Sequence, residues 1–84
     1  MTKDELFLLK LYEMAQKAGN PLAEVDALTV GRAIGQNDKG AITIVNTLAQ
    51  TNFIQKKEGT ILHLTPHGLK LVQHLLQERR QKWK

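Results

Sequence analysis

The segment DALTVGRAIGQNDKGAITIVNTLAQTN, residues 26–52, decides the fold of this chain. Asp26 stands before a short apolar run and can cap a helix, because its side-chain oxygen can accept a hydrogen bond from an exposed amide of the first turn. That helix is expected to end at Gly35, since glycine readily adopts the left-handed conformation that closes helices. After a polar connection, Asp38 can cap another helix that runs to about Thr51. The segment therefore predicts two helices joined by a tight turn.

The longer of these two helices has an apolar face and a polar face. Its side chains separate by helical periodicity into two groups, and the apolar group is expected to face the core. The expected core face consists of Ala41, Ile42, Ile44, Val45, Leu48 and Ala49. The polar face, which is open to solvent or to a ligand, consists of Lys39, Gly40, Thr43, Asn46, Thr47 and Gln50.

Another helix is predicted at the start of the chain. Thr2 and Glu5 form a capping-box pattern, and the helix is expected to run to about Ala18 before residues 19–21 end it. Residues 22–25 are a candidate short strand. The expected core side of the helix consists of Phe7, Leu11, Met14, Ala15 and Ala18, with Leu8 and Tyr12 at its edge.

The sequence after residue 52 predicts a hairpin and a last helix. Residues 53–57 and 60–64 alternate like two strands, and Gly59 can supply the positive φ of the tight turn at Glu58-Gly59 between them. Thr65 can then cap a helix whose first residue is Pro66, a position where the missing N–H is not needed.

Composition and length predict one small soluble domain. The 84 residues suffice for a single hydrophobic core, and the formal net charge of +4 favours polyanions but is ordinary for a domain of this size. The chain has no cysteine, which excludes disulfides and thiolate chemistry. It also has no apolar stretch long enough for a signal peptide or a membrane span, so a cytoplasmic location is expected.

Together these elements predict a mainly helical α+β domain over residues 1–84. Its order is helix, helix, tight turn, helix, hairpin and helix. The predicted parts are a first helix (1–19), a two-helix unit (26–52), a hairpin (53–65) and a C-terminal helix with a frayed end (66–84).

Three short motifs occur in this order along the chain. Residues 30–35 (VGRAIG) place a glycine inside a short helix, residues 48–54 (LAQTNFI) follow a helix end, and residues 64–68 (LTPHG) join the hairpin to the last helix. These motifs resemble those of winged helix-turn-helix regulators of the MarR and DtxR types, with Asn52 where the family has glycine. In that family, the small residue equivalent to Gly31 lets two helices cross closely.

The resemblance implies a three-helix core, a two-stranded wing and a C-terminal helix. It also implies sequence-specific binding of double-stranded DNA by a transcription regulator. The wing tip is only Glu58-Gly59, without the long charged loop of MarR proteins, and the metal-binding residues and second domain of DtxR proteins have no counterpart. The resemblance therefore assigns the superfamily and no subfamily.

By this resemblance, the helix that begins at Lys39 would enter the major groove. Its base-reading residues would be Thr43, Asn46, Thr47 and Gln50. Contacts to the DNA backbone would come from Lys39, Gly40, Lys56 and Lys57. The alternatives are that the helix face and the hairpin lysines are merely solvated, or that the domain binds a protein, because this helix face carries a single cation.

Surplus apolar residues on the terminal helices predict a homodimer. Leu6 and Leu9 fall opposite the expected core side of the first helix, and leucines cover almost half the circumference of the last helix. The expected dimer contacts are Leu6, Leu9, Leu71, Leu75 and Trp83. The alternative is a monomer that exposes a few leucines.

No motif indicates catalysis, a metal site or a cofactor. His63, His67 and His74 lack an Asp, Glu or Cys partner at ligand spacing, so they are expected to be ordinary surface or hydrogen-bonded histidines. The chain has no serine, and no carboxylate pair is flanked by a base. We therefore expect a binding domain and not an enzyme.

Overall fold

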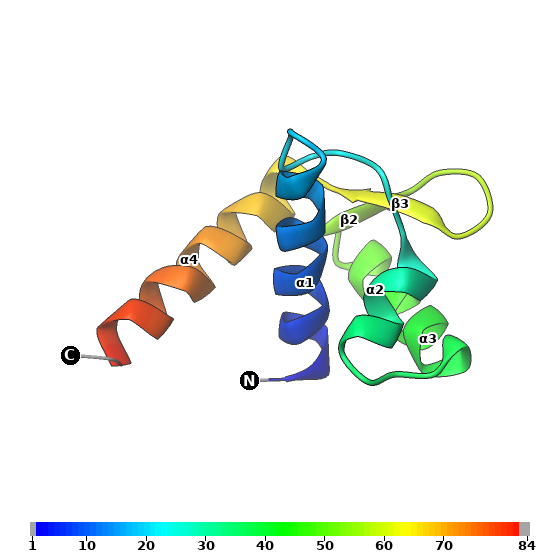
Figure 1. Ribbon diagram of the computed structural model, residues 1–84, viewed down its shortest axis with the longest axis horizontal. Helices are drawn as coiled ribbons and strands as arrows, with labels where there is room; N and C mark the ends of the chain where they lie inside the picture. Colours follow the sequence, from blue (N-terminus) through cyan, green and yellow to red (C-terminus); the bar gives the residue numbers. More distant parts are fainter. Residues whose placement is uncertain (1, 83–84) are drawn as a thin grey trace.

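The computed structural model describes residues 2–82, with side chains as far as residue 78. These residues form a mainly helical α+β domain with four helices and a three-stranded antiparallel sheet (Figure 1). In chain order the elements are α1 (Lys3–Lys17), β1 (Val25–Asp26), α2 (Ala27–Ala33), α3 (Asp38–Gln50), β2 (Ile54–Lys56), β3 (Ile61–Leu64) and α4 (Pro66–Lys82). Within residues 2–82, no helix combines the length and the apolar character needed to cross a membrane.

Helix α1 stands between α4 and the α2–α3 pair (Figure 1). Its predicted capping box is present, because the Thr2 hydroxyl accepts a hydrogen bond from the Glu5 N–H and the Glu5 carboxylate accepts one from the Thr2 N–H. Ala18 is the C-cap, and Gly19 follows it with a φ of 101°. Both ends of α1 are therefore set by local sequence, as predicted.

Strand β3 is the central strand of the sheet and pairs with both β1 and β2. The predicted hairpin is present, with Lys56 opposite Leu62, but its strands are shorter than expected and residues 57–60 connect them, with Gly59 at a φ of 60°. The strand expected at residues 22–25 lies later in the chain and begins at Val25. Val25 pairs with Leu62 along the edge of β3 that β2 does not occupy.

Helices α2 and α3 cross closely because residue 31 has no side chain. A Cβ atom built at Gly31 would lie 2.5 Å from the Cβ atom of Ala41, a distance that real side chains do not tolerate. The predicted close crossing is therefore confirmed. Helix α2 begins at its Asp26 cap, as expected, and Gly35 follows it with a φ of 81°.

The cap of α3 differs from the prediction by one residue. Asn37, and not Asp38, is the N-cap, because the Asn37 side chain accepts a hydrogen bond of 2.8 Å from the Gly40 N–H. Asp38 is the first helical residue, and its carboxylate pairs instead with Arg32 at 3.3 Å.

The end of α3, the hairpin and the start of α4 meet at Thr65. The Thr65 hydroxyl donates a hydrogen bond of 2.6 Å to the Asn52 carbonyl and accepts one of 3.0 Å from the Gly68 N–H, which makes it the cap predicted for α4. Asn52 has the expected left-handed backbone, with a φ of 66°. Gly68 lies so close to the Phe53 carbonyl that a Cβ atom there would clash with it. The LTPHG motif thus has a packing reason for both its threonine and its glycine.

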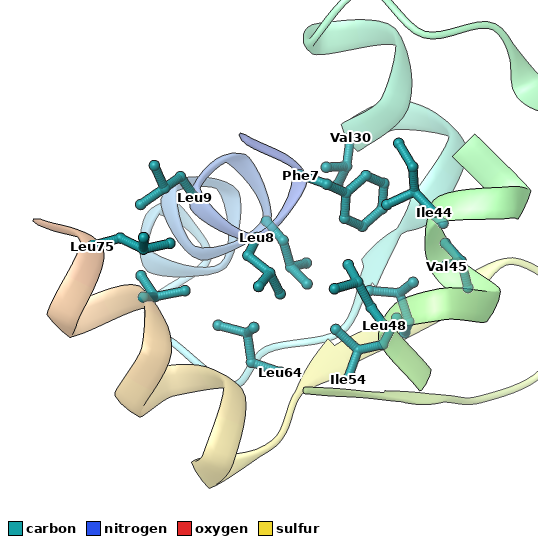
Figure 2. Packing of buried hydrophobic residues seen from close by; sticks show 14 residues of the cluster. Phe7, Leu8, Leu9, Val30, Ile44, Val45, Leu48, Ile54, Leu64 and Leu75 are labelled. Atoms are coloured by element: carbon teal, nitrogen blue, oxygen red, sulfur yellow. The ribbon is translucent and has the colours of Figure 1, made fainter. Parts of the chain in front are cut away.

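The hydrophobic core gathers around α1 (Figure 2). Phe7 and Leu11 of this helix are fully buried. The core extends through Leu62 and Leu64 of the central strand. Four residues of the predicted apolar face of α3 are buried as expected: Ala41, Ile44, Val45 and Leu48.

Leu9 and Leu75 are buried in the core of a single chain, although they were predicted as surplus apolar residues at a dimer interface. Their exposed fractions are 9% and 4%, and Figure 2 shows Leu9 of α1 close to Leu75 of α4. They are buried because α4 packs along the side of α1 that the helical pattern of α1 alone leaves uncovered. Leu71 is half-buried against the same core, and Trp83 lies outside the described residues.

Ile42 and Ala18 are exposed, although both were expected on core faces. Ile42 follows buried Ala41 and is therefore rotated from it by about 100° around α3. This rotation takes its side chain beyond the part of the helix that the core covers, and its exposed fraction is 39%. Ala18 is the C-cap of α1, where the chain leaves the core.

Candidate nucleic-acid interface

The polar face of α3 is open to solvent, because the opposite face anchors the helix in the core. The hydrophobic side chains of Ile44, Val45 and Leu48 fix its rotation. The exposed side chains are those predicted, namely Lys39, Thr43, Asn46, Thr47 and Gln50. The structure therefore brings these five candidate DNA contacts onto one accessible helix surface.

The two threonines on this face direct their hydroxyl protons into the helix. Thr43 donates to the Lys39 carbonyl at 3.1 Å, and Thr47 donates to the Thr43 carbonyl at 3.2 Å. Their outward groups are consequently methyls and oxygen lone pairs. Hydrogen-bond donors toward a ligand are then best supplied by the amides of Asn46 and Gln50.

The β2–β3 hairpin lies beside α3, and Lys56 connects the two. Its ammonium donates a hydrogen bond of 3.2 Å to the Asn46 side-chain oxygen. A groove of about 210 Å³ lies between helix and hairpin, with Ile42 and Asn46 on the helix side and Lys56 and Ile61 on the hairpin side. A cation from the hairpin therefore sits at the edge of the polar helix face.

Lys57 lies on another side of the hairpin. Its ammonium is 3.9 Å from the carboxylate of Glu24, and it lines a shallow hollow together with Glu58 and Ile61. The structure thus brings Lys56, but not Lys57, to α3. The sequence predicted DNA-backbone contacts from both lysines, but the structure separates them, and Lys57 lies one residue beyond the end of β2.

Gly40 has a local structural role. Its N–H is taken by the Asn37 cap, and a Cβ atom there would lie 2.7 Å from the Gln36 side-chain oxygen. This amide is already hydrogen-bonded to the Asn37 cap, so it is not offered to a phosphate.

Ile42 was missed as a site residue by sequence reasoning. It lies on the groove side of α3, one helical turn before Asn46. The signal that could have found it is its position at the margin of the apolar arc.

The three histidines make separate contacts. The His67 ring stacks on Phe53 with ring centres 4.6 Å apart, and the His63 Nδ1 atom lies 2.8 Å from the Leu64 carbonyl oxygen. His74 lies 3.2 Å from a carboxylate oxygen of Glu78. Among residues 2–82, no group of three side chains is placed to hold a metal ion.

A second groove, of about 340 Å³, lies between α1 and α4. Apolar atoms of Leu9, Tyr12 and Leu76 line it, with Glu13 and Lys17 at its border. Leu6, on the same stripe of α1 as Glu13, is 42% exposed, as predicted. Of the proposed dimer contacts within the described side chains, Leu6 is the one that clearly faces solvent.

Comparisons with known proteins add no assignment. No family model, no curated protein and no solved structure matches the chain. The candidate interface rests on the geometry of α3 and the hairpin.

Proposed function

We propose that this chain is a winged helix-turn-helix domain that binds double-stranded DNA with sequence preference and regulates transcription. Helix α3 is the recognition helix, and the β2–β3 hairpin is the wing. The observation that carries the proposal is the exposed polar face of α3 beside a hairpin cation, Lys56.

The architecture supports this proposal. Two helices joined by a tight turn, a hairpin and a last helix follow one another in the order of a winged helix. The close contact at Gly31 and the junction at Thr65 give physical reasons for two of the motifs that resemble this superfamily.

The chemistry of α3 suits the major groove. That groove is about 12 Å wide and admits one α-helix. The amides of Asn46 and Gln50 can each make paired hydrogen bonds with an adenine edge. Lys39 and Lys56 would neutralise phosphates and set the register of the helix. We also propose that the domain acts in the cytoplasm, and that it acts by binding and not by catalysis.

A protein-interaction module is the second candidate. It is favoured by the single cation on the α3 face and by the exposed apolar side chain of Ile42. Salt dependence distinguishes the two, because neutralised phosphates release counterions and a mainly apolar protein interface does not.

The test is a binding selection over random duplexes, repeated at about 50 mM and about 200 mM salt. We expect an enriched sequence and a steep loss of affinity with salt. Asn46→Ala and Gln50→Ala should each reduce discrimination among duplexes by about 1–3 kcal/mol. Gln73→Ala, a matched change of an exposed residue on α4, should leave discrimination unchanged. Binding that ignores sequence in all variants, or no binding at low salt, would favour the protein-interaction module.

A further inference from the structure

Ile42 is an exposed aliphatic side chain at the edge of the polar face of α3, on the side of the hairpin groove. In the part of the chain that the structure describes, only Leu6 and Ile42 are large hydrophobic residues with substantial exposure, at 42% and 39%. Leaving an isoleucine half-exposed there forgoes the stabilisation that burial would provide. A partner that covers it would recover that stabilisation.

The surroundings of Ile42 narrow the chemistry of that partner. The groove beside it has apolar walls from Val45 and Ile61 and a polar rim from Asn46 and Lys56. Its volume of about 210 Å³ is below the roughly 300–1,000 Å³ of typical small-molecule sites. The groove is therefore too small for a typical free metabolite. It suits a small apolar group that is part of a larger molecule, one whose negative charge and hydrogen-bonding groups match Lys56 and Asn46 at the rim.

A thymine in duplex DNA presents such a group. Its C5-methyl projects into the major groove and is the apolar feature by which proteins recognise this base. Asn46 lies one turn along α3 from Ile42, about 5–6 Å between Cβ atoms at this spacing, so the two side chains can meet neighbouring base pairs. The cation of Lys56 at the rim complements the phosphates.

We propose that Ile42 reads the C5-methyl group of a thymine next to the base pair that Asn46 contacts. This inference rests on the proposed function and names a specificity-determining residue within it. The contact would make the preferred site rich in A·T pairs at this position.

The test removes only the methyl group. In the duplex enriched by selection, each thymine is replaced in turn by uracil, which pairs identically and lacks the C5-methyl. Covering one methyl group corresponds to about fourfold in affinity, so we expect one position at which uracil weakens the parent about fourfold. In Ile42→Ala, the thymine and uracil duplexes should bind equally at that position.

Leu6→Ala is the matched control, because Leu6 is the other exposed aliphatic residue and lies on α1. Its overall affinity can change, but its ratio of thymine to uracil affinity at the sensitive position should equal that of the parent. Thermal unfolding of Ile42→Ala checks that the variant is folded, which its surface position leads us to expect.

The outcomes separate the two proposals. Sequence-dependent binding with no uracil-sensitive position, or sensitivity that persists in Ile42→Ala, overturns the role of Ile42 and leaves the proposed function standing. A failure to bind any duplex overturns both. Loss of the uracil effect in Ile42→Ala alone supports the inference.

Discussion

Lys56 and Lys57 are neighbours in sequence, but they are in different electrostatic settings. Lys56 touches Asn46 on the proposed reading face, whereas Lys57 lies near Glu24 on another side of the hairpin. We expect Lys56→Ala to weaken binding to all duplexes and to reduce the slope of log affinity against log salt by about one, because about one fewer counterion is released. Lys57→Ala is the matched control and should leave the slope nearly unchanged.

The measurement is a titration of DNA binding at several salt concentrations for the parent and both variants. An equal reduction of the slope in both variants would contradict this separation. It would support the simpler expectation from sequence, in which both lysines contact phosphates.

Glu5 makes the stability of α1 depend on pH. The hydrogen bond from the Thr2 backbone N–H holds the pKa of the Glu5 carboxyl below its ordinary value, which is about 4.3. Because the folded pKa is the lower one, the stabilisation is complete above the ordinary pKa and is lost as pH falls through the folded pKa.

We therefore expect the advantage of the parent over Glu5→Gln to shrink under acid conditions. The glutamine keeps an acceptor for the Thr2 N–H but does not titrate in this range. Denaturant unfolding from about pH 7 down to about pH 3 measures the difference, which should be constant near neutrality and narrow below about pH 4.3. A difference that stays constant across the whole range would contradict the role of the Glu5 charge.

At the scale of elements, the α2–α3 crossing depends on the pair Gly31 and Ala41. Gly31→Ala should improve helix propensity by up to about 1 kcal/mol, but it places a methyl group against a Cβ atom that is fixed to the α3 backbone. Overpacking of this kind costs about 1–3 kcal/mol. We expect net destabilisation, measured as a lower midpoint of denaturant unfolding.

The exchanged pair tests the geometry directly. Gly31→Ala combined with Ala41→Gly removes the clash, so the double variant should be more stable than the sum of the two single changes predicts. If the changes in unfolding free energy of the two single variants simply add in the double variant, the two helices move apart without cost and the close contact does not matter. The same crossing carries α3, so poor packing here should also impair any activity of its exposed face.

At the scale of the whole molecule, we propose that a second copy docks at the groove between α1 and α4. The two helices diverge toward the end of α4 (Figure 1), an apolar groove lies between them, and Leu6 is exposed on α1. A two-fold dimer would bury this surface and could place two α3 helices about one turn of DNA apart.

Leu6→Glu should weaken this dimer and leave the fold intact, because Leu6 is outside the core. Sedimentation over a range of protein concentrations measures the change, and Ile42→Glu, at the other exposed aliphatic position, is the control. Leu9→Glu is unsuitable, since it places a charge in the core. A parent that sediments only as a monomer at high micromolar concentration would contradict the dimer.

The sequence by itself determined the elements whose signals are local. The capping box at Thr2, the Asp26 cap, the left-handed Asn52 and the turn at Gly59 all depend on residues a few positions apart. Periodicity likewise identified the exposed polar face of α3, because one helix is enough to define it. These features follow from backbone conformation and short-range hydrogen bonds, which neighbouring residues control.

Only the tertiary structure decided which faces are covered. Leu9 is buried because α4 packs against its side of α1, and Ile42 is exposed because the core leaves the margin of α3 uncovered. The contact of Lys56 with Asn46 likewise requires the hairpin and α3 to meet. Burial and side-chain partners depend on elements distant in sequence, so a helical pattern shows which residues share a face but not what lies against it.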